Sequence, residues 1–233
     1  MKVFAISDPH LSFANPKPMD VFGDRWENHA QRMKDAWQKK VGDEDIVLVP
    51  GDISWAMKEK DAMADLNFLA SCPGYKVILR GNHDYWWNSI SKVRAMLPEK
   101  FYAIQNDSLR FGKLLLCGTR GWVCPGSAVY NEEEDRKIYE REVLRLQLSL
   151  QSLKRAEGDH VIAMLHYPPF NEKREESGFS SALAEAKVDQ VIYGHLHGKS
   201  CMGAFEGFRD GIEYHLVSGD HLQFEPKCLL ELV

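Results

Sequence analysis

The sequence predicts an α/β fold in which helices cover central β-sheets. Two observations favour this class. Short β-branched apolar runs alternate with amphipathic helical patterns in the first half of the chain, and further short apolar runs follow toward its end. No repeat, low-complexity tract or linker divides the 233 residues, so we expect a single domain over residues 1–233.

Seven short apolar runs have the length and β-branched content of strands. In chain order they are Val3–Ile6, Ile46–Val49, Val77–Leu79, Leu114–Cys117, Val161–Leu165, Val191–Tyr193 and Tyr214–Val217. Apolar residues at helical spacing predict helices from Trp26 to Val41 and from Trp86 to Leu97. A third helix is expected over Glu132–Ala156, where an acidic start suits a helix N-terminus. Its apolar stripe is short, which favours a helix covering its own sheet over a coiled coil.

Composition excludes several classes of protein. A formal net charge of −5, with acidic residues spread along the chain, gives no basic footprint and argues against a nucleic-acid partner. The five cysteines are odd in number and show no C-x-x-C spacing, so we expect reduced thiols in a cytoplasmic protein. The apolar start at Val3–Ile6 is too short for a signal peptide or a membrane span, so no membrane association is expected.

Five of the predicted strands deliver Asp, His or Asn to their carboxyl ends, with Gly or Pro alongside. The motifs are Asp8-Pro9-His10, Gly51-Asp52, Gly81-Asn82-His83-Asp84, His166, and Gly194-His195-Leu196-His197. In α/β sheets, ligands bind beyond the carboxyl ends of the strands. Residues two apart in extended backbone point to the same side, so each Asp-x-His or His-x-His pair can present two ligands to one point. Each motif alone is an ordinary turn, but their conjunction predicts a metal site.

Together these motifs resemble the calcineurin-like metallophosphoesterases. The resemblance runs from residue 8 to residue 197 and implies a four-layer α/β/β/α sandwich, with two mixed β-sheets flanked by helices. It implies a hydrolase that cleaves a phosphomonoester or a phosphodiester by a metal-activated hydroxide at a dinuclear site. The expected substrate is a small phosphorylated metabolite or a nucleotide.

The resemblance also implies which residues hold the two metal ions. One ion would be held by Asp8, His10, Asp52 and His197, and the other by Asp52, Asn82, His166 and His195. Asp52 would bridge the two. Imidazoles with carboxylates and one amide oxygen favour Mn²⁺, Fe or Zn²⁺ over Ca²⁺ and Mg²⁺.

Two further residues match catalytic positions of that family. His83 would protonate the leaving group, and Asp84 would orient the His83 ring. Two others are candidates for substrate contact: Arg120 follows a predicted strand in a loop over residues 119–135, and Trp87 lies in the aromatic run after Asp84. The second motif continues without the arginine of the serine/threonine protein phosphatases, which argues against protein phosphatase activity.

Two alternatives stay open. A nuclease of the same family would carry a basic groove or an added DNA-binding segment, and the acidic sequence shows neither. A non-catalytic scaffold that binds protein partners would be expected to lose metal ligands or the histidine that carries the proton. All of those positions are filled here, which favours the enzyme.

Overall fold

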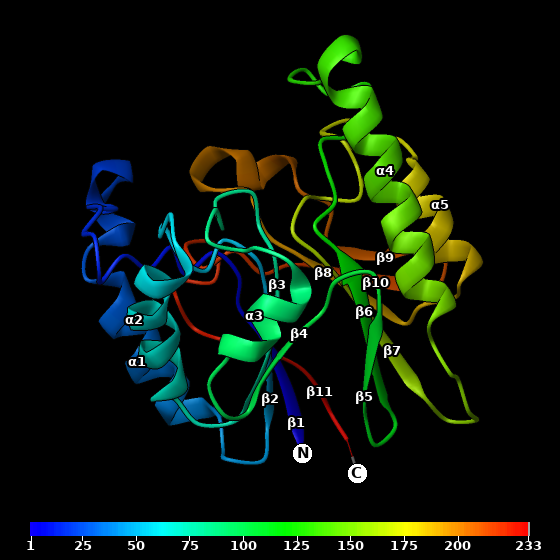
Figure 1. The fold of residues 1–233 in the computed structure, drawn as a ribbon. Coiled ribbons are helices and arrows are strands. Elements are labelled where there is room, and N and C mark those ends of the chain that lie inside the picture. The colour runs from blue at the N-terminus through cyan, green and yellow to red at the C-terminus, as the bar shows by residue number, and fades with distance from the viewer. Residues whose placement is uncertain (233) are drawn as a thin grey trace. The chain divides into compact units, whose positions relative to one another are not determined.

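The computed structural model describes residues 1–232 and divides into two compact units. The first unit comprises Met1–Ala103 together with the chain from Val217 onward, and the second comprises Ile104–Leu216. Each unit contains one mixed β-sheet with helices beside it, which confirms the α/β class and the two sheets (Figure 1). The single domain over residues 1–233 stays a prediction.

The first unit is built on a five-stranded sheet with the order β11-β1-β2-β3-β4. Its strands are β1 (Lys2–Ala5), β2 (Ile46–Pro50), β3 (Tyr75–Leu79), β4 (Phe101–Ala103) and β11 (Lys227–Glu231). Strands β1 to β4 run parallel, and β11 pairs antiparallel with β1. Because β1, β2 and β3 are parallel neighbours, the loops that follow them emerge at the same edge of the sheet.

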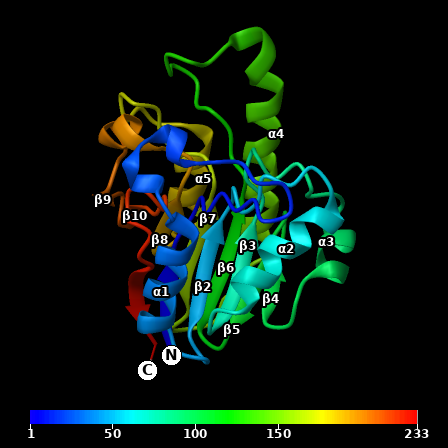
Figure 2. The same ribbon diagram turned by 90° about the vertical axis from the view of Figure 1, so that its left-hand side faces the viewer.

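Helices α1 (His29–Lys40) and α2 (Glu59–Ala70) lie against one face of this sheet, in front of it in Figure 2. Met33 and Trp37 are one turn apart on α1, and both are fully buried in the same hydrophobic cluster as β2. Three shorter elements complete the unit: η1 (Asp20–Phe22), η2 (Asp24–Trp26) and α3 (Ile90–Met96).

The second unit is built on a six-stranded sheet with the order β5-β6-β7-β8-β10-β9. Its strands are β5 (Ser108–Phe111), β6 (Leu114–Thr119), β7 (His160–Leu165), β8 (Gln190–Tyr193), β9 (Gly207–Arg209) and β10 (Ile212–Leu216). Strands β6, β7, β8 and β10 run parallel, and the two edge strands are antiparallel to their neighbours. Strands β7 and β8, which end at the predicted histidine ligands, are adjacent.

Helices α4 (Glu132–Gln151) and α5 (Gly178–Glu185) pack together beside this sheet (Figure 1). The side chain of Asn131 caps α4 by accepting a hydrogen bond of 3.0 Å from the Glu133 amide. Ser177 caps α5, and η3 (Gly198–Gly203) follows the last predicted motif. Within residues 1–232, no helix combines the length and apolar character that a bilayer crossing requires.

All seven predicted strands are present, within two residues of the expected bounds at each end. All three predicted helices are longer than the observed ones, and Trp26, at the predicted start of the first, lies in η2 instead. Helix α4 ends at Gln151 because the Ser152 hydroxyl bonds to the Ser149 carbonyl at 2.7 Å, an alternative to further helical turns. Trp86 lies outside α3 because its indole bonds to Asp84 in the preceding turn.

Candidate metal centre

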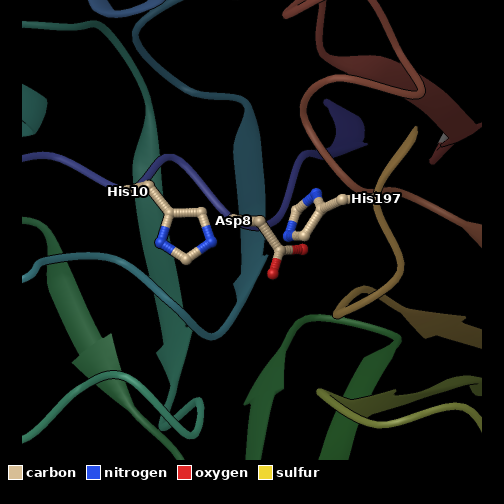
Figure 3. Close-up of side chains that lie close together, drawn as sticks. All are labelled: Asp8, His10 and His197. Atoms are coloured by element: carbon tan, nitrogen blue, oxygen red, sulfur yellow. The ribbon is translucent and has the colours of Figure 1, made fainter. Parts of the chain in front are cut away.

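The segment after β1 carries Asp8 and His10, both buried and both in the left-handed backbone region, with φ of 57° and 44° (Figure 3). The main chain fixes this segment to the loop after β2. The Asp8 amide donates to the Gly51 carbonyl at 3.1 Å, and the His10 amide donates to the Asp52 carbonyl at 3.0 Å. Non-glycine residues rarely adopt this conformation, and such outliers cluster at functional sites.

Asp52 lies in the loop after β2 and also has a left-handed backbone, with φ of 52°. Its Oδ2 is 3.6 Å from His10 Nε2, and a carboxylate oxygen of Asp52 lies within 4.8 Å of one of Asp8. Two buried carboxylates this close repel each other unless a cation lies between them. Carboxylates with an imidazole at this separation therefore fit a transition-metal ion.

The loop after β3 approaches Asp52 so closely that only glycine fits at its start. A Cβ added to Gly81 would lie 2.1 Å from Asp52 Oδ1 and 2.2 Å from the Asp52 amide nitrogen. Two residues later, the His83 amide donates to the same Oδ1 at 2.8 Å. Asn82 lies between these two contacts, so its side chain originates beside the Asp52 carboxylate.

Asp84 is fully buried and binds four N–H groups with its carboxylate. Its Oδ1 accepts from the Ile53 amide at 2.9 Å, the Ser54 amide at 3.1 Å and the Trp86 indole at 3.0 Å. Its Oδ2 accepts from the Gly81 amide at 2.8 Å. These bonds tie the loop after β2 to the loop after β3, so Asp84 positions the residues around Asp52 as a group.

His83 is half-buried among aromatic side chains. The ring of Trp55 lies 4.4 Å from the His83 ring and 5.0 Å from the His10 ring, between centroids. The Tyr85 hydroxyl is 3.5 Å from His83 Nδ1. The ring is therefore held in place on one side by an indole and can exchange a hydrogen bond with a phenol.

In the second unit, His166 follows β7 and His195 follows β8, and their rings are 5.1 Å apart. The Tyr167 ring packs against His195 with centroids 4.0 Å apart. His195 has a left-handed backbone, with φ of 70°. His197 begins η3, where the Ser200 hydroxyl accepts from its amide at 2.9 Å and donates to its carbonyl at 2.7 Å. This unit therefore contributes imidazoles held by packing and by a turn.

A family model described as calcineurin-like phosphoesterase matches residues 1–199, which is most of the chain and includes every motif described above. The chain belongs to the calcineurin-like phosphoesterase family. The resemblance predicted from the sequence is thereby confirmed. The family description indicates phosphoester hydrolysis, and the buried Asp and His residues provide a possible metal site.

Two solved structures share this fold at low sequence identity. One is phosphopantetheinyl hydrolase (PptH) from Mycobacterium tuberculosis, with 12% identity, a TM-score of 0.60, and coverage of 99% of this chain and 96% of that chain. The other is a protein of unknown function, AQ665 from Aquifex aeolicus, with 15% identity, a TM-score of 0.53, and coverage of 97% and 95%. No curated protein matches the chain significantly.

The two residues predicted to contact substrate have different surroundings. Arg120 pairs with the buried carboxylate of Glu142 at 3.3 Å and lies 4.7 Å from the Trp122 ring centroid. Its carbonyl accepts the amides of His166 and Tyr167, so Arg120 supports the histidine loop through its main chain. Trp87 is only 3% exposed within the hydrophobic core of the first unit, which leaves almost no ring surface for a ligand.

Sequence reasoning missed three residues near the site. Trp55 contacts both His10 and His83. It is the third residue after Asp52, and this closeness to a predicted ligand was a sequence signal that could have identified it. Tyr85 is the exposed member of the aromatic run in which Trp87 was chosen. His29, in α1, bonds to the Pro9 carbonyl between Asp8 and His10 at 3.0 Å, and burial lowers its pKa. Helical periodicity alone gave no signal for that contact.

Proposed function

We propose that this chain is a hydrolase that uses two divalent metal ions to cleave a phosphoester bond of a small phosphorylated substrate. The observation that carries the proposal is the cradle around Asp52. Three proposed ligands, Asp8, His10 and Asp52, share left-handed backbone and lie within reach of a common cation, with His83 hydrogen-bonded beside them. Strained backbone of this kind persists only where the surroundings fix it, as at functional sites.

The ligand set that we assign draws on both units. Asp8, His10, Asp52 and Asn82 would come from the first unit. From the second unit we assign His166, His195 and His197, the last of which is drawn in Figure 3. Four imidazoles, two carboxylates and one amide, with Asp52 as the bridging carboxylate, suit Mn²⁺, Fe or Zn²⁺. When bound, a pair of such ions polarises phosphoryl oxygens and lowers the pKa of a coordinated water.

The remaining steps belong to the chain's own side chains. His83 would donate a proton to the leaving oxygen, because its ring is half-buried yet tethered through its amide to Asp52. Trp55 packs against the ring in a tilted arrangement, and Tyr85 can take up or return a hydrogen bond at Nδ1. Asp84 keeps the loop that carries His83 aligned with the loop that carries Asp52.

The test is a paired assay on metal-depleted protein reconstituted with Mn²⁺. It compares p-nitrophenyl phosphate with bis-p-nitrophenyl phosphate, using His83→Ala, Asp52→Asn and, as a matched control, His160→Asn. We expect metal-dependent turnover that falls about 100-fold or more in both site variants and is kept in the control. The preferred compound distinguishes a monoesterase from a diesterase. Failure of the wild-type protein to bind metal would contradict the proposal.

A second measurement separates the role of His83 from that of the metal ligands. Protonation by His83 matters most when the leaving group is a poor one. His83→Ala should therefore impair propyl phosphate more strongly than p-nitrophenyl phosphate, whereas Asp52→Asn should impair both alike. Equal losses on both substrates in His83→Ala would refute the proton-donor role.

A further inference from the structure

The second unit contains a cavity of about 580 Å³, a size typical of small-molecule sites. Its walls come from the loop between β6 and α4, from the segment after β7, and from η3 with the residues after it. Aromatic and aliphatic side chains dominate the lining, with Trp122, Tyr167, Phe170, Leu196 and Phe205 among them.

Most polar groups in the walls are already engaged by the protein. Asp135 accepts from the Trp122 indole at 2.8 Å and from the Asn131 amide at 2.8 Å. Glu172 accepts from the Ala128 amide at 2.7 Å, and the Tyr193 hydroxyl donates to the Phe205 carbonyl at 2.6 Å. An occupant therefore meets mostly apolar surface, with the ammonium group of the exposed Lys199 as a charged group in the wall.

The amide and thiol of the lining follow the same pattern. Asn171 donates to the Pro125 carbonyl at 3.0 Å and to Glu175 at 2.6 Å, and its oxygen accepts from the amides of Lys173 and Glu175. Burial raises the pKa of the Cys124 thiol to about 12, so it stays neutral. A sugar placed here would lose the hydration of its hydroxyl groups and find few new partners.

The cavity reaches one of the proposed metal ligands directly. His195 forms part of the wall, and the Tyr167 ring lies 4.0 Å from it. Trp122 continues the row of rings, with its centroid 5.2 Å from that of Tyr167. A molecule whose phosphate is bound at His195 would thus have its organic part beside these aromatic side chains.

We propose that this cavity binds the organic group of the substrate, and that this group is uncharged and largely apolar, carrying a ring or an alkyl chain. The assignment rests on the proposed phosphoesterase function, because it places the phosphate at His195. It selects aryl and alkyl phosphoesters over sugar phosphates. The apolar group gains by leaving water for an aromatic surface, and a sugar loses hydrogen bonds.

Kinetics with matched leaving groups test the assignment. Propyl phosphate and 3-phenylpropyl phosphate release similar alcohols, so their kcat/KM ratio reports binding of the phenyl group. We expect a preference of about 30-fold for the phenyl compound in the wild-type protein. Glycerol phosphate should be turned over no faster than propyl phosphate.

Two variants fill the cavity from different walls. Ala128→Trp places an indole on the exposed loop while keeping the amide that bonds to Glu172. Gly203→Leu is sterically allowed, since an added Cβ meets only the Glu172 Cβ at 3.6 Å. The preference should fall to about threefold or less in both, and persist in Ala156→Trp, an exposed alanine outside the cavity.

Binding of 3-phenylpropanol to the metal-free protein, followed by saturation-transfer NMR, separates this proposal from the proposed function. Binding in the wild type that is lost in both filling variants supports the cavity assignment, even if no phosphoester is hydrolysed. In that case the proposed function fails and the cavity remains a ligand site. Hydrolysis without a phenyl preference, together with no binding of 3-phenylpropanol, would overturn the cavity assignment and leave the phosphoesterase intact.

Discussion

The two units hold their proposed ligands by different physical means. In the first unit, N–H groups bind the carboxylates: the His83 amide donates to Asp52, and three main-chain amides with the Trp86 indole converge on Asp84. In the second unit, ring packing holds the imidazoles, as Tyr167 does for His195. Where two main-chain segments lie in close contact, as at Gly81 and Asp52, an added atom displaces a whole loop. Packing between side-chain rings can instead loosen gradually as the ring is made smaller. We therefore expect abrupt losses from changes in the first unit and graded losses in the second.

The largest effect is expected from Gly81→Ala. The added Cβ would overlap the amide nitrogen and Oδ1 of Asp52, and a backbone atom cannot move aside without shifting the whole loop. We expect turnover to fall about 100-fold or more, since a displacement of about 1 Å at a reacting centre has that consequence. Mn²⁺ titration by calorimetry and the phosphoester assay measure it.

Gly42→Ala is the matched control in the same unit, because its added Cβ would approach Asp45 Oδ2 at an ordinary 3.4 Å. It should bind Mn²⁺ and turn over substrate as the wild type does. Wild-type Mn²⁺ affinity in Gly81→Ala would show that the loops around Asp52 are not rigid. The expectation of abrupt losses in the first unit would then be wrong.

Asp84→Asn should have the next largest effect, on stability as well as on activity. An amide offers one oxygen where the carboxylate offers two, so at least one of the four donors would face an NH₂ group in a buried site. We expect the free energy of unfolding to fall by about 2–4 kcal/mol, measured by urea titration. The exposed Asp20→Asn should change it by less than about 0.5 kcal/mol. Equal stabilities would mean that the four bonds contribute no net stabilisation.

In the second unit, Tyr167→Leu tests whether ring packing positions His195. Loss of the packed ring should weaken Mn²⁺ binding by about tenfold, the range seen when groups that orient metal ligands are removed. Tyr167→Phe keeps the ring and should lose less. If the Tyr167→Leu and Tyr167→Phe proteins bind Mn²⁺ equally well, packing does not hold the His195 imidazole, and the second unit must fix its ligands in another way.

The strands and the motif residues were predictable because their signals are local. Buried parallel strands are short β-branched runs, and β2 is buried at every residue, so its sequence shows an unbroken apolar run before Gly51-Asp52. The edge strand β11 was not predicted, since its alternation of exposed and half-buried residues is weak. Helix α5 was missed because its eight residues contain two serines and begin at a glycine.

The contacts around the site needed the structure, because they join residues distant in sequence. The role of Asp84 in orienting the His83 ring stays a prediction. The hydrogen bonds from the main-chain amides of Ile53 and Ser54 to Asp84 could not be read from the sequence, because they join two separate motifs. The aromatic run after Asp84 gave no basis for distinguishing exposed Tyr85 from buried Trp87. Burial depends on how the turn is oriented, and periodicity does not determine that for an irregular segment.

The smallest effect is expected from Lys76, which lies near the amino end of β3, at the opposite end of the strand from Gly81. Its side chain is buried and donates to the Gly74 carbonyl at 2.9 Å, and burial lowers its pKa from 10.5 to about 8. Between pH 8 and 10.5 the unfolded chain keeps a proton that the folded chain has lost, so unfolding takes up that proton. The contribution of Lys76 to stability therefore rises with pH over this window.

The measurement is the difference in unfolding free energy between the wild type and Lys76→Met, followed from pH 7 to pH 10. We expect this difference to be constant below about pH 7.5. Above that pH the wild type should gain about 1–3 kcal/mol of stability relative to Lys76→Met. Subtraction removes the titration of groups that are common to both proteins and do not interact with Lys76. Mn²⁺ affinity at pH 7 should be the same in both, because the residue is remote from the proposed ligands of its own unit. Parallel stability profiles would show that burial does not depress this pKa. A loss of Mn²⁺ affinity would show that the rigidity of the first unit extends along β3 to its amino end.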